Sequence, residues 1–188
     1  MYTFQPARWE DADDIARVHS LGWEQTFGEI LPADFIYSVN SRRQEQYSKL
    51  LESPNPSDQS ALVVAVHHDS ASDVMESIAG CCTIRKNQSK CGTVQHAFGF
   101  ELACVYVLAA HHGTGASKKL LRAGLELMAM QPSDTMFCKV FEKNSRAVRF
   151  YEKMGATPVG REVTTEYSVE PEAILIMGWS SVQGILGS

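Results

Sequence analysis

Residues 111–121 are HHGTGASKKLL, with two glycines between an apolar run and a run of helical spacing. Glycine is the poorest helix former after proline, so its presence at Gly113 and Gly115 needs a reason. One reason is close approach of a ligand, because glycine has no Cβ to block it. Backbone N–H groups at the start of a helix bind phosphate well. The stretch by itself leaves an anion cradle and a plain strand-to-helix turn equally open.

Two nucleotide motifs fail at the same position. A P-loop that begins at Gly113 needs glycine where the chain has Lys118. The dinucleotide fingerprint G-x-G-x-x-G fits Gly113 and Gly115 but again needs glycine at Lys118. We therefore do not expect a nucleotide-hydrolysing protein or a dinucleotide-binding domain.

Strand-like and helix-like segments alternate along the whole chain. Hydrophobic patterning predicts strands at 1–7, 61–66, 75–86, 100–108, 135–141, 157–168 and 172–179. It predicts helices at 9–28, 116–130 and 144–155, and one or two more within 30–53. Residues 53–60 are a polar turn region, and no repeat or linker divides the chain. The prediction is one domain, residues 1–188, of mixed α/β (α+β) class with a central sheet covered by helices.

Composition excludes several classes of partner. Seventeen basic and 22 acidic side chains give a net charge of −5, which argues against nucleic acid. No apolar run approaches the ~20 residues that a membrane span needs. The N-terminus lacks the basic start and apolar core of a signal peptide. We expect a cytoplasmic protein with no membrane partner.

Neither the cysteines nor the other polar clusters predict a metal site. There are five cysteines, an odd number, and none forms a C-x-x-C pair, so neither a disulfide framework nor a zinc site is indicated. Cys104 and Cys138 lie in apolar runs and are interpreted as reduced core residues. The acidic cluster at 10–14 suits a helix N-terminus. The adjacent histidine pairs at 67–68 and 111–112 lack the i, i+4 spacing of a helical metal site.

The segment 105–121 resembles the acyl-CoA signature of the GNAT superfamily of N-acetyltransferases. Val105, Tyr106 and Val107 occupy the end of the strand that precedes the family's Gly-rich loop. The loop pattern aligns with His112, Gly113, Thr114, Gly115, Ala116 and Ser117. The family's second motif, N-x-x-A-x-x-F-Y-x-x-x-G, is matched by Asn144, Ala147, Phe150, Tyr151 and Gly155. The resemblance is strong over 101–156 and looser elsewhere.

Four positions depart from the family pattern. His112 replaces the usual Gln or Arg, and it can still donate a hydrogen bond although it is only partly charged at neutral pH. Ser117 is small and adds a hydroxyl group. Ala109 stands where proline is frequent, and Ala156 where phenylalanine usually ends the second motif. None of these changes removes a backbone donor, so we expect coenzyme binding to survive.

The resemblance implies a mostly antiparallel sheet of about six to seven strands, flanked by about four helices. It also implies transfer of the acetyl group of acetyl-CoA, as co-substrate, to a primary amine of a small molecule or peptide. The loop 113–117, with His112, Lys118 and Asn144, would hold the coenzyme phosphates. The backbone of Val105, Tyr106 and Val107 would pair with the pantetheine arm as an added strand does.

Two residues are candidates for the proton transfers. Tyr151 occupies the family's acid position, where it would protonate the leaving thiolate, although its helix face also fits a core tyrosine. Glu101 is the only carboxylate in its strand and would deprotonate the ammonium. Strand alternation places residues 101, 103, 105 and 107 on one face, but a bulge would change this. A salt-bridged glutamate at the sheet end is the structural alternative.

The acceptor side is less defined by the sequence. Trp23, Phe27 and Tyr37 belong to the N-terminal helices, which usually form the wall of the acceptor pocket in this family, although aromatic residues at such spacing also fit a core. Acceptor identity does not follow from fold. A non-catalytic acyl-CoA sensor of the same fold is the alternative function, and a homodimer is left open as the oligomeric state.

Overall fold

The computed structural model describes residues 1–52, 59–68, 77–168 and 170–187. The strands are β1 (Tyr2–Pro6), β2 (Ser60–His67), β3 (Ser77–Lys86), β4 (Phe100–Val107), β5 (Met136–Phe141), β6 (Thr157–Thr164) and β7 (Glu172–Trp179). The α-helices are α1 (Ala12–Phe27), α2 (Ala33–Asn40), α3 (Arg43–Glu52), α4 (Ala116–Leu127), α5 (Ser145–Lys153) and α6 (Gln183–Leu186). Short 3₁₀ turns are η1 (Trp9–Asp11), η2 (Val94–Ala97) and η3 (Ala109–His111).

The strands form one seven-stranded sheet in the order β1-β2-β3-β4-β5-β7-β6. Every neighbouring pair is antiparallel except β4 and β5, which are parallel. The predicted fold class, a mixed and mostly antiparallel sheet flanked by helices, is confirmed. The region predicted as one or two helices forms two, α2 and α3, and Pro32 is the N-cap of the first.

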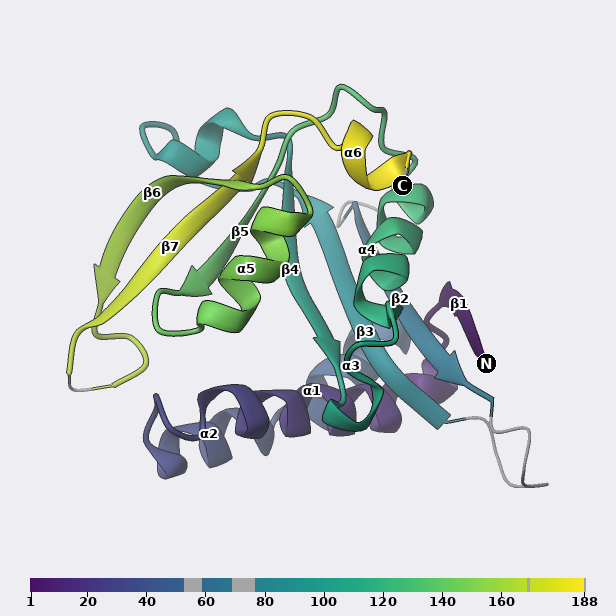
Figure 1. Ribbon diagram of the computed structural model, residues 1–188. Coiled ribbons are helices and arrows are strands. Elements are labelled where there is room, and N and C mark those ends of the chain that lie inside the picture. The colour runs from purple at the N-terminus through teal and green to yellow at the C-terminus, as the bar shows by residue number, and fades with distance from the viewer. Residues whose placement is uncertain (53–58, 69–76, 169, 188) are drawn as a thin grey trace.

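Helices cover both faces of the sheet (Figure 1). On one face α1 and α3 bury an apolar cluster with β2 and β3, in which Ile15, Val18 and Tyr47 meet Val64 and Cys81. On the other face α4 and α5 pack on a larger cluster that runs from β2 to β7. This two-sided burial explains why β2 and β3 are nearly continuous apolar runs.

The ends of α4 and α5 follow local signals. Gly115 is the N-cap of α4 with φ 81°, and Gly155 follows α5 with φ 89°, a left-handed conformation that glycine adopts without strain. The Asn144 side chain caps α5 by accepting a hydrogen bond from Ala147 N at 3.1 Å. The prediction that α4 continues to residue 130 was wrong, because the helix ends at Leu127 and Ala129 takes φ 51°.

Strands β4 and β5 separate soon after they begin. Their pairing comprises Phe100 with Met136 and Glu101 with Phe137, both at the strand starts. Beyond these residues the two strands diverge toward α1 (Figure 1). The backbone edge of β4 from Ala103 onward is therefore not paired with β5 in the described structure. This divergence opens the sheet where the candidate site lies.

A bulge in β4 corrects the predicted side-chain alternation. Thr83 of β3 pairs with Cys104, whereas Ile84 pairs with Leu102, so Ala103 is the extra residue. Residues that pair across two strands have side chains on the same face of the sheet. Glu101 therefore shares a face with Cys104 and Tyr106, on the side covered by α1. The alternation that would put residues 101, 103, 105 and 107 on one face is therefore broken, and the bulge that the sequence left open as an alternative is present.

The remaining predictions have mixed outcomes. Cys138 is buried as expected, but Cys104 is only partly buried and is not a core residue. Residues 53–58 of the predicted polar turn region lie outside the described residues. Across the described part of the chain, no helix is long and apolar enough to cross a membrane.

Candidate active site

A cavity of about 1100 Å³ lies between β4 and β5, bounded by α1 on one side and by the starts of α4 and α5 on the other. It brings together most of the residues predicted for the site, which are Trp23, Phe27, Glu101, Val105, Tyr106, Val107, His112, Gly113, Gly115, Ala116, Ser117, Lys118, Asn144 and Tyr151. The segments are far apart in sequence. The divergence of β4 from β5 is therefore what assembles the site.

The glycine loop forms one end of this cleft. Gly113 and Gly115 have φ of 77° and 81°, which side-chain-bearing residues rarely adopt. A Cβ built on either would meet no atom within 4 Å, because both face open space in the cleft wall. The glycines therefore serve the turn geometry and also leave the backbone at the start of α4 open to a ligand.

Side chains within the loop hold it in place. The His112 ring donates from Nε2 to the Val107 carbonyl at 2.7 Å, and the Thr114 hydroxyl donates to the His111 carbonyl at 2.8 Å. The expected donation from His112 to the coenzyme is thus replaced, at Nε2, by a bond that joins the loop to β4. Ordering of the loop before ligand binding lowers the entropy lost on binding.

Basic side chains on α5 extend this end of the cleft. Arg146, Arg149 and Lys153 line it together with Lys118 of α4. The spacing of the three α5 residues puts them along one side of the helix, and the sequence analysis did not identify them. Asn144, predicted to bind coenzyme, lines the cleft but uses its side chain as the helix cap.

Tyr151 lies at the bottom of the cleft between α5 and the sheet. It is 8% exposed, and its ring meets Trp179 edge-on at 5.8 Å. Burial raises the pKa of the phenol well above its ordinary value, so the hydroxyl stays protonated at neutral pH. A hydrogen bond from Tyr151 partly offsets the rise that burial causes in the pKa of Cys138. Tyr151 is therefore both a core residue and a protonated donor in the cleft wall.

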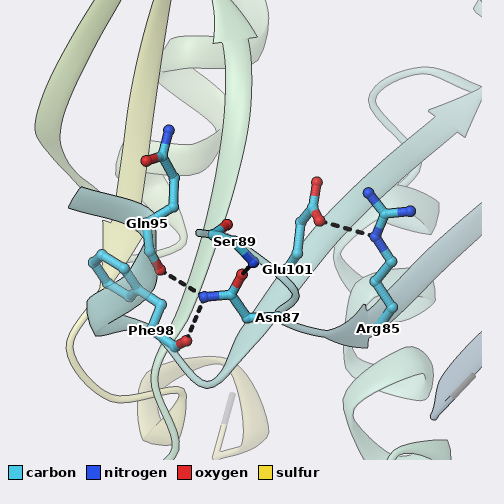
Figure 2. Close-up of polar contacts among 6 residues, drawn as sticks. All are labelled: Arg85, Asn87, Ser89, Gln95, Phe98 and Glu101. Atoms are coloured by element: carbon cyan, nitrogen blue, oxygen red, sulfur yellow. Dashed lines mark hydrogen bonds and ion pairs between the residues drawn. The ribbon is translucent and has the colours of Figure 1, made fainter. Parts of the chain in front are cut away.

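Glu101 lies on the opposite wall, near the point where β4 leaves β5. Its Oε2 accepts a hydrogen bond from Arg85 Nε at 2.8 Å, and Figure 2 shows the two side chains pointing toward each other from adjacent strands. The Glu101 side chain remains 18% exposed, and Arg85 is half exposed. The Glu101 carboxylate is therefore ion-paired, as expected for a salt-bridged glutamate at the end of the sheet. It also lines the cleft, as expected for a base.

The loop before β4 is fixed by one asparagine. Asn87 donates to the carbonyls of Gln95 and Phe98 at 2.6 and 2.7 Å, and its Oδ1 accepts from Ser89 N at 2.8 Å (Figure 2). These bonds close the connection between β3 and β4 close to the Arg85–Glu101 pair. They hold the start of β4, and with it Glu101, in a defined position.

The aromatic residues expected on the acceptor side separate into two groups. Trp23 and Phe27 line the cleft, with ring centroids 5.1 Å apart, and Phe27 also packs on Phe141. Tyr37 is 76% exposed and is not part of the cleft wall, so its predicted position was wrong. Tyr106 lines the cleft, and its ring also lies against that of His19, with centroids 4.5 Å apart and planes tilted by 31°.

Comparison with known proteins places this arrangement in a family. Residues 21–156 match the model of the acetyltransferase (GNAT) family. The chain belongs to this family. A GNAT chain is an acetyltransferase, and the resemblance of 105–121 and 144–155 to the GNAT motifs is thereby confirmed. Within the described residues, no group of three or more His, Cys, Asp or Glu side chains could hold a metal ion.

Individual relatives agree with the GNAT assignment. The chain is 30% identical over 152 residues to the uncharacterized N-acetyltransferase YuaI of Bacillus subtilis, covering 81% of this chain and 78% of YuaI. The fold resembles the paia N-acetyltransferase of Thermoplasma acidophilum in complex with coenzyme A, with 18% identity, a TM-score of 0.70 and coverage of 95% and 98%. It also resembles yncA of Salmonella typhimurium with its cofactor acetyl-CoA, with 14% identity, a TM-score of 0.60 and coverage of 97% and 94%.

Proposed function

We propose that this GNAT protein transfers the acetyl group of acetyl-CoA to a primary amine by direct attack. The observation that supports this most is the cleft, in which an open glycine loop, a protonated tyrosine and a carboxylate line one cavity. Two solved structures of the same fold contain coenzyme A or acetyl-CoA.

The residues present fit coenzyme A. Both glycines face open space, and the first turn of α4 directs its N–H groups toward it. Lys118, Arg146, Arg149 and Lys153 supply positive charge for the phosphate groups. The edge of β4 that β5 leaves free has backbone groups for the amides of the pantetheine arm.

Two side chains of this chain would move protons. Glu101 would take a proton from the acceptor ammonium, directly or through water, so that the nitrogen lone pair can form the new N–C bond. As the C–S bond breaks, Tyr151 would donate its hydroxyl proton toward the departing sulfur, and the phenolate would regain a proton when the acylated nitrogen loses its second one. Acetyl-CoA, when bound, supplies the activated acetyl group. The single domain 1–188 would contain all of these residues.

A panel of amines with acetyl-CoA, with free thiol release as the readout, tests this function. We expect release above the hydrolysis background for at least one amine class, with the N-acetylated product found by mass spectrometry. Tight coenzyme A binding in calorimetry with no release for any amine would instead support the acyl-CoA sensor. Absence of coenzyme A binding would refute both.

A further inference from the structure

A second cavity of about 240 Å³ lies beside the cleft, between α1, α3 and the bulge of β4. Its lining residues are His19, Arg43, Gln46, Tyr47, Leu50, Thr83, Ala103 and Cys104. Ala103 and Cys104 also line the main cleft. The two cavities therefore adjoin along the bulged part of β4, on the face that also presents Glu101.

Arg43 in this second cavity is a buried cation without an ionic partner. It is 4% exposed, and its Nη2 has no hydrogen-bond partner. Its Nε donates to Asn40 Oδ1 at 2.8 Å, and its guanidinium lies 4.7 Å from the ring centre of Trp23, a residue of the cleft wall. Among the described residues no carboxylate forms an ion pair with it, and Glu24 is linked to it through the Asn40 amide.

The neighbouring side chains do not supply a full counter-charge to Arg43. The pKa of His19 is lowered to about 3 by burial and by the charge of Arg43, so the ring is neutral and shares a 2.6 Å hydrogen bond with the Tyr47 hydroxyl. Burial raises the pKa values of Tyr47 and Tyr106, which stay neutral too. Of the acidic groups near Arg43 in the described residues, only the Cys104 thiol has a lowered pKa, about 7, so it carries part of a negative charge at neutral pH.

A buried, unpaired charge destabilises a fold, and an apolar side chain of similar volume is often as stable or more so. A buried arginine that lacks an anionic partner indicates a ligand that supplies the missing anion. The planar guanidinium matches a carboxylate, with two parallel N–H donors. Arg43 lies next to Trp23, on the proposed acceptor side of the cleft, so the acceptor is the molecule whose carboxylate would reach it.

We propose that Arg43 binds a carboxylate of the acceptor, and that the acceptor is therefore an amine that also has a carboxylate group. This inference rests on the proposed function. Glu101 and Cys104 share a face of β4, and the strand rise puts them about 7–10 Å apart. An acceptor with its amine near Glu101 and its carboxylate near Arg43 has the two groups several bonds apart.

Binding can be tested without catalysis. Thermal unfolding is measured for the parent protein, Arg43→Met and Arg43→Lys, each with glutarate or with its uncharged analogue glutaramide. We expect a saturable rise in Tm with glutarate for the parent only, because a ligand that binds the folded state stabilises it. Arg43→Met without ligand should unfold at or above the parent temperature. Equal glutarate shifts in the parent and Arg43→Met, or no shift in either, would overturn the proposal.

Kinetics then tests the acceptor class with a matched pair, 5-aminopentanoate and 5-aminopentanamide. For Arg43→Met we expect kcat/KM to fall about 10- to 10²-fold on the carboxylate and to change little on the amide, the scale of one charge-assisted hydrogen bond. Arg43→Lys should restore part of the loss. An equal loss on both amines would show that Arg43 supports the fold only.

The two proposals fail in different ways. If glutarate stabilises the parent protein and not Arg43→Met while no amine is acetylated, the acetyl-transfer proposal fails and the anion site stands. If amines are acetylated with no preference for a carboxylate and glutarate has no effect, the acetyl-transfer proposal stands and the role of Arg43 is refuted. If Arg43→Met raises the pKa of Cys104 and has no other effect, the Cys104 thiolate is the partner of Arg43. That result would also refute the proposal that Arg43 binds a carboxylate of the acceptor.

Discussion

The two ends of the cleft are constructed differently. The proposed coenzyme end is made of the loop 112–118, in which every residue except Thr114 lines the cleft at the start of one helix. The proposed acceptor end uses side chains from separate elements, namely Trp23 of α1 and Glu101 of β4, with Arg43 of α3 in the adjoining cavity. Local backbone conformation defines the first end, and helix-to-sheet packing defines the second.

This difference determines how each end responds to substitution. A loop whose glycines face open space can change its backbone and its ligand affinity without loss of core packing. On the acceptor side a Cβ at Gly22 would lie 2.6 Å from the Tyr106 ring, so α1 and β4 are in tight contact. A change there alters the packing and the site together, because packed interiors have little free space.

The largest expected effect is at the coenzyme end. Gly115→Val should reduce coenzyme A affinity by about 10³-fold or more, because φ 81° disfavours a β-branched residue and several charge-assisted bonds depend on this backbone. Calorimetry with coenzyme A measures it. Gly92→Val is the matched control, since Gly92 also has positive φ and open space but lies outside the cleft. Equal affinity for both folded variants would exclude the loop as the phosphate site.

At the acceptor end, Glu101→Gln should lower kcat/KM by about 10²-fold or more at neutral pH, the scale of a general base. The loss should shrink at high pH, where more of the amine is already neutral. Glu142→Gln is the control, because Glu142 is also ion-paired with an arginine but does not line the cleft. A loss of the same size at every pH would assign Glu101 to binding or structure.

Tyr151 joins the two ends, and Tyr151→Phe should lower turnover by about 10- to 10³-fold with coenzyme A affinity nearly unchanged. The ring packing on Trp179 is kept, so Tm should change little. Steady-state rates and calorimetry on the same preparation separate turnover from binding. Turnover close to that of the parent would show that Tyr151 is a core residue without a catalytic role.

The smallest expected effect concerns Cys104, whose pKa is lowered to about 7 by hydrogen bonds with Cys81 and Thr83 and by the charge of Arg43. Removal of that charge in Arg43→Met should raise the pKa. At pH 7 a rise of about one unit would slow alkylation by iodoacetamide about fivefold, because the thiolate fraction falls. Both proteins need Cys91→Ser, since Cys91 is exposed. An unchanged alkylation rate would place Arg43 outside electrostatic reach of the thiol.

Features that depend on neighbours along the chain could be predicted from the sequence. The strand-to-helix turn at Gly113 and Gly115, the Asn144 cap and the Gly155 stop are local, because capping and positive φ depend on a few adjacent residues. The GNAT motifs lie in these same local stretches, which is why the family could be identified before the fold was known.

The remaining features depend on contacts between segments that are far apart in the chain. The bulge at Ala103 turned Glu101 toward the α1 side, and the alternation expected from the sequence could not reveal it because a bulge depends on the pairing of β4 with β3. Tyr37 lies outside the cleft and Arg43 lies buried beside it, although both belong to amphipathic helical segments. Helical spacing indicates which residues share a face, but which face meets the sheet is set by contacts between segments far apart in the chain.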